Sequence, residues 1–192
     1  MSSHDRQVGY LSIHATMLAE LKAMWEDPKV QLYGDTEFPN DTSEGSVFLA
    51  GPTSRNQILK YQWRAQAVAL LRYYGFKGWI FCPEPRGLEA AGDFTEKKYI
   101  HHWESERLWR AERVMFWIPR KADELLGLNT NLELGMCLGR VIFNSPSRRH
   151  LFVGWPDEAE RMGLPKHYMD EVIVQRYSSL PSLCADVANS KY

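Results

Sequence analysis

The sequence has few cysteines and no excess of charge of one sign. Its three cysteines, Cys82, Cys137 and Cys184, are far apart and odd in number, so a disulfide-stabilised scaffold is not indicated. Two of them fall within apolar runs, as is typical of small core residues in a reducing compartment. The formal net charge is -1, so no basic excess indicates a protein that binds duplex nucleic acid.

Long apolar segments are also missing. No run approaches the ~20 apolar residues that a membrane-spanning helix needs. No apolar stretch follows residues 1–6, so a secretory signal peptide is not expected. We therefore expect a cytoplasmic protein without a membrane partner. Its 44% hydrophobic content over 192 residues is enough for a sizeable core, which suggests one domain with an extension.

Two common cofactor signatures are absent as well. The six histidines show no metal-ligand spacing, and the neighbours His101 and His102 cannot both face one metal from a regular helix. The Gly51-Pro52 dipeptide is not part of a G-x-G-x-x-G fingerprint. Neither a metal site nor a dinucleotide site is indicated.

Short apolar runs alternate along the chain with segments that have the apolar spacing of helices. The expected strands are residues 46–50, 79–82, 114–118, 150–153 and 172–174. The expected helices are residues 58–74, 102–111, one that begins at 131, and 183–188 with Ser182 as its cap. This alternation predicts an α/β fold with a mostly parallel, five-stranded sheet and helices on both faces.

The first 45 residues differ from the rest. A helix is expected from Ser12 to about Trp25, because its apolar residues recur at helical spacing, and residues 30–33 suit a short strand. We predict a helical extension over residues 1–45 and an α/β domain over residues 46–192.

The turn after the first strand of this domain is a candidate ligand contact, since open α/β sheets bind ligands outside the carboxyl ends of their strands. It contains Gly51, Pro52 and Thr53. Glycine allows close backbone approach, and the hydroxyl can donate a hydrogen bond to a ligand.

A long segment, residues 84–101, follows the second strand and is interpreted as a lid or substrate loop. Arg86 and Asp93 are its candidate polar contacts. Arg55, Arg64 and Arg86 can each hold a phosphate, or can equally be surface residues.

Tryptophans lie near these expected loops. Trp63, Trp103 and Trp109 can stack on a planar ligand. The alternative, which the aromatic content favours, is that they fill the core or a subunit interface.

Glu133 is the candidate nucleophile. It lies between two leucines at the start of the expected helix after strand 114–118, and so at the carboxyl edge of the sheet. The alternative is a capping box, in which Thr130 is the N-cap and Glu133 reaches back to it. Asn129 and Asn131 are candidate substrate contacts, or turn and capping residues.

Glu104 is the second candidate. It shares a helix face with Leu108 and Ala111, which directs it toward the same edge as Glu133. Two carboxylates in one crevice suit acid/base and nucleophilic work at a glycosidic bond. We expect the helix N-terminus to keep Glu133 ionised, with Glu104 as the proton donor. The alternative for Glu104 is an exposed acid beside Arg107.

An ordered set of short motifs resembles the nucleoside 2-deoxyribosyltransferase-like family over roughly residues 46–153. The motifs are Phe48–Thr53, Trp63-Arg64-x-x-Ala67, Cys82–Arg86, Trp103-Glu104, Ala111–Pro119 and Asn131–Gly135.

The resemblance implies a flavodoxin-like fold and a reaction at the N-glycosidic bond of a nucleoside or nucleotide. By position, Glu133 matches the nucleophile of the family, and Glu104 matches an acid that handles the proton of the base. The segment Gly51-Pro52-Thr53 matches the loop that lines the ligand pocket. The resemblance also implies a homo-oligomer, a dimer or larger, whose subunits complete each other's sites, and it implies no cofactor.

Three hypotheses remain open from the sequence. The protein transfers or hydrolyses a glycosidic bond, or it is a non-catalytic nucleotide-sensing domain on the same fold, or it is an interaction protein whose aromatic residues form an interface. The base, the sugar and the need for a 5′-phosphate are not determined by these residues.

Overall fold

The computed structural model describes residues 3–33, 35, 37–53, 63–85, 97–143 and 150–190. Its centre is a sheet of six strands in the order β1-β3-β2-β4-β5-β6. All five neighbouring pairs are parallel. The strands are β1 Val30–Tyr33, β2 Ser46–Ala50, β3 Trp79–Pro85, β4 Arg113–Trp117, β5 Leu151–Gly154 and β6 Arg176–Tyr177.

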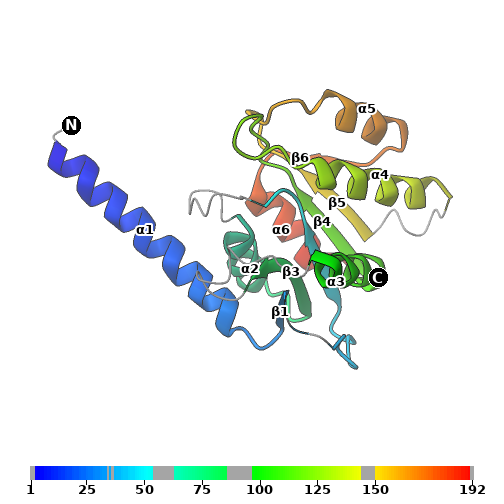
Figure 1. Cartoon of the computed structure of the whole chain (residues 1–192), viewed down its shortest axis with the longest axis horizontal. Helices are drawn as coiled ribbons and strands as arrows, with labels where there is room; N and C mark the ends of the chain where they lie inside the picture. The colour runs from blue at the N-terminus through cyan, green and yellow to red at the C-terminus, as the bar shows by residue number, and fades with distance from the viewer. Residues whose placement is uncertain are drawn as a thin grey trace.

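Six helices accompany these strands in the described part of the chain. They are α1 Ser3–Glu26, α2 Trp63–Tyr73, α3 Lys97–Arg110, α4 Leu128–Phe143, α5 Gly163–Glu171 and α6 Leu180–Asn189. Figure 1 shows the sheet between them, with α1 projecting far from the rest of the molecule. No described helix is long and apolar enough to cross a membrane.

The core has two halves, one on each face of the sheet. Val47 and Leu49 of β2 pack with α1, α2 and α6, whereas Phe48 and Ala50 pack with α3, α4 and α5. Successive strand residues point to opposite faces, and both faces are covered. This explains why the central strands are uninterrupted apolar runs, and the predicted doubly covered parallel sheet is confirmed.

The predicted number of strands was wrong. The segment 30–33 forms the edge strand β1, which pairs with β3 and extends the sheet to six strands. The last strand was also misplaced: β6 is Arg176–Tyr177, while Val172 is the C-cap of α5 and Ile173 is exposed with φ of 57°. The helix α5 was not predicted. The division of the chain at residue 45 stays a prediction, although β1 lies within the first part and pairs with the second.

Helix boundaries differ from those predicted for local reasons. α6 begins at Leu180, because Ser179, and not Ser182, caps it by accepting a hydrogen bond from the Ser182 amide. α3 begins at Lys97, so the loop predicted over residues 84–101 ends earlier. Its residues 86–96, including Arg86 and Asp93, lie outside the described residues, as does Arg55.

The direction of the winding reverses at β2. β3 follows it in the chain and lies on one side, and β4 lies on the other. Such a reversal is the place where open α/β sheets form a ligand crevice, outside the carboxyl ends of the two strands. Gly51 leaves β2 at this point with φ of 149°, and an added Cβ would lie 2.2 Å from the Trp117 carbonyl oxygen at the end of β4. Only glycine fits so close to that backbone.

Candidate active site

A buried arginine holds the turn after β2. Arg64 of α2 is 2% exposed and donates to the backbone oxygens of Leu49 (3.1 Å) and Gly51 and to Thr53 Oγ1 (3.1 Å). Trp63 is buried beside it and donates from Nε1 to the Pro52 oxygen at 3.1 Å. The shape of the turn is therefore set by side chains from the start of α2.

The charge of Arg64 is balanced by a buried acid. Its Nη1 lies 2.6 Å from Oε1 of Glu84, near the end of β3. Burial raises the pKa of Glu84, while the Arg64 charge lowers it. Because the guanidinium is already engaged by Glu84 and the turn, it is a poor candidate for the phosphate site considered above.

Glu104 lies next to this pair. α3 begins earlier than predicted, so Glu104 is in the middle of the helix and not in its first turn. It is half-buried and accepts a hydrogen bond from the hydroxyl of Tyr33, at the end of β1. Arg107, considered above as its partner, contacts Glu106 at 2.9 Å, and Glu106 also forms an i,i+4 pair with Arg110 at 2.7 Å.

Glu133 is not in a capping box. α4 begins at Leu128, so Thr130 and Glu133 are both inside the helix, and Glu133 lies in its second turn. Gly127, with φ of 62°, turns the chain into the helix against Pro52, whose Cβ would be 2.9 Å from an added Cβ. The start of α4 is thereby packed on the turn after β2.

The expected ionisation of Glu133 was wrong. Burial, and then the negative charge of Glu104, raise the pKa of Glu133 to about 7, against a smaller opposing effect of Arg64. Glu133 lies in the second turn of α4 and not in the first turn as predicted. The helix dipole, which acts mainly on the first turn, therefore does little to keep Glu133 ionised. Glu133 is thus divided between its neutral and ionised forms near neutral pH.

These effects join the carboxylates into one cluster. The charge of Glu104 acts on both Glu84 and Glu133, and the charge of Arg64 acts on both as well. The structure therefore brings together Glu84, Glu104 and Glu133, from β3, α3 and α4, around one arginine. Such a group can exchange a proton and present a carboxylate to a neutral or cationic centre.

The remaining predicted contacts divide into three groups. Gly51, Pro52 and Thr53 form the turn beside the cluster, and Asn129 lies one helical turn before Glu133 on the same face of α4. Asn131 is on another face, where its side-chain oxygen accepts from Arg120. Trp63 is buried under the turn, which favours the core alternative for this residue.

The other two tryptophans also have protein partners. Trp103 is buried against Tyr33, and its Nε1 donates to the Asp35 backbone oxygen at 2.9 Å. Trp109 is 37% exposed and has the guanidinium of Arg140 over its ring at 4.9 Å.

Two residues were not predicted as site residues, namely Glu84, a member of the cluster, and Tyr33, which donates to Glu104. Glu84 carried a weak signal, because it is an acid at the end of an expected buried strand. Tyr33 carried none, since it lies 71 positions before Glu104.

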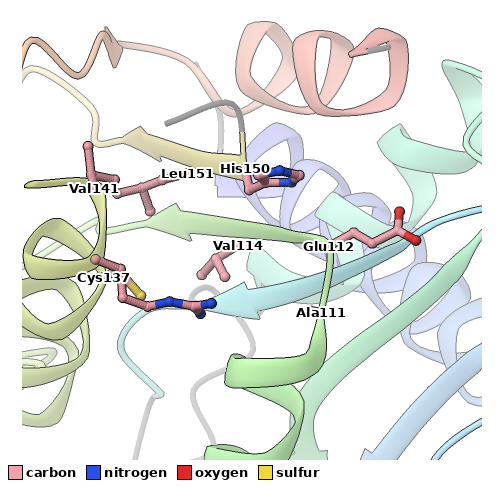
Figure 2. Close-up of a pocket in the computed structure, with 8 residues that line it drawn as sticks. Ala111, Glu112, Val114, Cys137, Val141, His150 and Leu151 are labelled. Carbon is pink, nitrogen blue, oxygen red and sulfur yellow. The ribbon is translucent and has the colours of Figure 1, made fainter. Parts of the chain in front are cut away.

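A cavity lies at the amino edge of the sheet, opposite the end where Glu84 leaves β3. This cavity of about 210 Å³ is formed at the amino ends of β4 and β5 and along α4. In Figure 2, Glu112 turns its carboxylate away from Cys137 and Val141. Burial raises the pKa of Cys137 to about 12, so this thiol stays protonated and is not a nucleophile at neutral pH. The cavity is separate from the carboxylate cluster.

Comparison with known families adds one match. A family model described as nucleoside 2-deoxyribosyltransferase like matches residues 44–143. The matched segment is 100 of the 192 residues, just over half of the chain, and contains Arg64, Glu84, Glu104 and Glu133. No curated protein matches the chain.

Proposed function

Because the chain belongs to the nucleoside 2-deoxyribosyltransferase-like family, we propose that it cleaves or transfers at the N-glycosidic bond of a nucleoside or nucleotide. The observation that carries the proposal is the coupling of Glu104 and Glu133 at the crevice of the sheet. Enzymes that cleave glycosidic bonds commonly use two carboxyl groups whose surroundings differ, so that one donates a proton and the other acts as a carboxylate.

The proposed reaction proceeds in two steps. The Glu133 carboxylate attacks the anomeric carbon, the bond from that carbon to the base nitrogen breaks, and Glu104 gives its proton to the departing base. A second base or water then attacks the same carbon, which releases Glu133 and returns a proton to Glu104. The second nucleophile decides between transfer and hydrolysis.

The electrostatics of the pair couple the ionisation of the two carboxyl groups. The Glu104 charge is one cause of the raised pKa of Glu133. When Glu104 takes up the proton, this charge disappears and Glu133 ionises more readily. Protonation of Glu104 therefore favours the ionised form of Glu133, so the proton donor and the nucleophile reach their reactive forms together.

Base release from a panel of nucleosides and 5′-nucleotides, followed by chromatography, tests the proposal. Release of free base from at least one member is the expected result. Adding a different free base separates the two reactions, since a new nucleoside forms only if the protein is a transferase. If no member is cleaved but one raises the melting temperature, the protein is a nucleotide-binding domain without this activity.

Replacing Glu104 by glutamine is expected to lower kcat about 100-fold, because the departing base loses its proton donor. It also removes a negative charge that raises the pKa of Glu133. In the wild-type protein kcat/KM should fall as the pH rises above about 7, because the reactive form holds one proton, on Glu104, and the pair of carboxyl groups loses its last proton there. In the variant glutamine has no proton to lose in this range, so the alkaline fall should be absent. An alkaline fall that persists in Glu104→Gln contradicts the proposed coupling.

We also propose that the protein is a homo-oligomer with α4 at the interface. Leu128, Leu132 and Met136 are 67%, 69% and 44% exposed and lie at four-residue spacing on one face of α4. Exposed apolar residues in such a row suit burial against a second copy. Because Leu132 is next to Glu133, the second copy would lie beside the site.

Leu132→Arg is expected to reduce the molar mass measured by light scattering to that of a smaller species, because it places a charge in this row. Tyr73→Arg is the matched control. Tyr73 is 80% exposed on α2, and its replacement should leave the mass unchanged. Equal masses for Leu132→Arg and the wild-type protein would place the interface elsewhere.

A further inference from the structure

Strand β1 brings a tyrosine to the carboxylate cluster from outside the segment that the family model matches. Tyr33 is the last residue of β1, and the matched segment begins only at residue 44. Its hydroxyl donates to Oε1 of Glu104. An element added at the edge of the sheet therefore contacts a residue that we place in the reaction.

The pairing of β1 with β3 determines where this hydroxyl lies. Gln31 pairs with Phe81, but Tyr33 pairs with Pro85, so the register shifts between the two. The shift places Tyr33 beside the end of β3, where Glu84 is found. Its ring then packs edge-on against Trp103, with centroids 5.1 Å apart.

Further contacts tie the end of β1 to α3, the helix that carries Glu104. Arg107 donates from Nε to the Gln31 side-chain oxygen at 3.1 Å and from Nη2 to the Asp35 backbone oxygen at 3.0 Å. Trp103 donates to the same Asp35 oxygen. Because these contacts join the two elements on both sides of Tyr33, its hydroxyl is held at a fixed place relative to Glu104.

The surrounding charges determine which group carries the proton. Burial and the negative charge of Glu104 raise the pKa of Tyr33 far above its usual range. Tyr33 thus remains a hydrogen-bond donor at any pH at which the protein works. The other charged groups that act on this pair are Glu84 from β3 and Arg64 from α2, and Glu133 on α4 is affected through Glu104.

We propose that Tyr33 is a positioning residue that orients the Glu104 carboxyl group toward the departing base. The inference rests on the proposed function for the role of Glu104. It extends the working site to β1, which forms part of the chain before the family segment.

Tyr33→Phe tests the proposal, with Tyr177→Phe as its matched control. Tyr177 lies on β6, the other edge strand, and its hydroxyl likewise donates to a carboxylate, that of Asp186. Two substrates are compared: a nucleoside that the wild-type protein cleaves, and a p-nitrophenyl glycoside of the same sugar, whose phenolate leaves without a proton.

Tyr33→Phe is expected to lower kcat on the nucleoside about tenfold, with KM unchanged and the nitrophenyl glycoside affected about threefold at most, because only the first leaving group needs a correctly placed proton. Tyr177→Phe should leave both reactions unchanged. Equal losses on both substrates would overturn the proposal, because a merely structural tyrosine acts on both.

A second measurement needs no turnover. Carboxyl ¹³C NMR follows the titration of Glu133, whose signal is assigned by its loss in Glu133→Gln. The negative charge of Glu104 is one cause of the raised pKa of Glu133, and a carboxylate that has lost its hydrogen bond to Tyr33 changes its distance from Glu133, so the midpoint of Glu133 should move away from about 7.

An unchanged midpoint in Tyr33→Phe overturns the proposal whether or not the protein is active. If the wild-type protein releases no base from any nucleoside, a shifted midpoint in Tyr33→Phe still supports the link between Tyr33 and Glu104. In that case it is the proposed function that fails.

Discussion

Glu133→Gln is expected to abolish the release of base, with kcat at least about 10⁴-fold below that of the wild-type protein. Glutamine keeps the size of the side chain but cannot form the covalent link to the anomeric carbon. The measurement is single-turnover base release, with mass spectrometry to detect the glycosylated protein in the wild type and its absence in the variant.

Measuring the stability of Glu133→Gln shows whether a loss of activity comes from the missing carboxylate or from unfolding of the protein. The pKa of Glu133 is raised to about 7 in the folded protein, above its value in the unfolded chain. Ionised Glu133 therefore destabilises the fold, and this cost is fully present above about pH 7 and absent below the unfolded pKa. Glu133→Gln should be at least as stable as the wild-type protein at pH 8, with the difference vanishing near pH 4.

Asp123→Asn is a matched control for these measurements, because it likewise replaces an acid by its amide, here an exposed acid in the loop that precedes α4. It should leave the rate within about twofold of wild type, as is usual for surface substitutions away from a site. If Glu133→Gln retained a tenth of the wild-type rate, Glu133 would not be the nucleophile.

The sheet was predictable because its strands are apolar on both faces. Runs such as Ser46–Ala50 and Arg113–Trp117 are buried throughout, and their alternation with helices leaves few arrangements other than a doubly covered parallel sheet. The segment 172–174 shows the limit of this argument. It has the β-branched composition of a strand, yet Val172 caps α5 and Ile173 adopts a positive φ, because the end of α5 determines its backbone.

The position of Glu133 was predictable, but its surroundings were not. Its place after β4 follows from the order of elements alone. The capping-box pattern of Thr130 and Glu133 was misleading, because Gly127 begins the turn into α4 earlier, where it packs on Pro52. That contact joins residues distant in the chain, so no local pattern records it. The hydrogen bond of Tyr33 to Glu104 is hidden for the same reason.

Arg64→Met is expected to cause the largest loss of stability, about 3–5 kcal/mol in the free energy of unfolding. The substitution keeps the apolar stem but leaves the buried carboxylate of Glu84 without its cation at 2.6 Å. It also removes the donors to the backbone oxygens of Leu49 and Gly51, which hold the turn after β2. Urea unfolding followed by circular dichroism measures the loss.

The double variant Arg64→Met/Glu84→Gln divides this loss into its parts. Removing both charges should restore the part due to the unpaired carboxylate, and the remainder reports the hydrogen bonds to the turn. Arg72→Met is the matched control on the same helix. Arg72 pairs with Asp27 at 2.7 Å and donates to two backbone oxygens, but its side chain is 26% exposed against 2% for Arg64.

Water screens the charges of the Arg72 pair and can replace its hydrogen bonds. Arg72→Met should therefore lower the free energy of unfolding by about 1–2 kcal/mol. Equal losses for the two single variants would show that burial does not set the strength of the Arg64 pair. The same outcome would mean that Arg64 does not hold the turn after β2 to the carboxylates, because its hydrogen bonds would then be no stronger than those of a partly exposed pair. A larger loss at Arg64 that the double variant only partly restores is the result expected if the guanidinium both balances Glu84 and shapes the crevice.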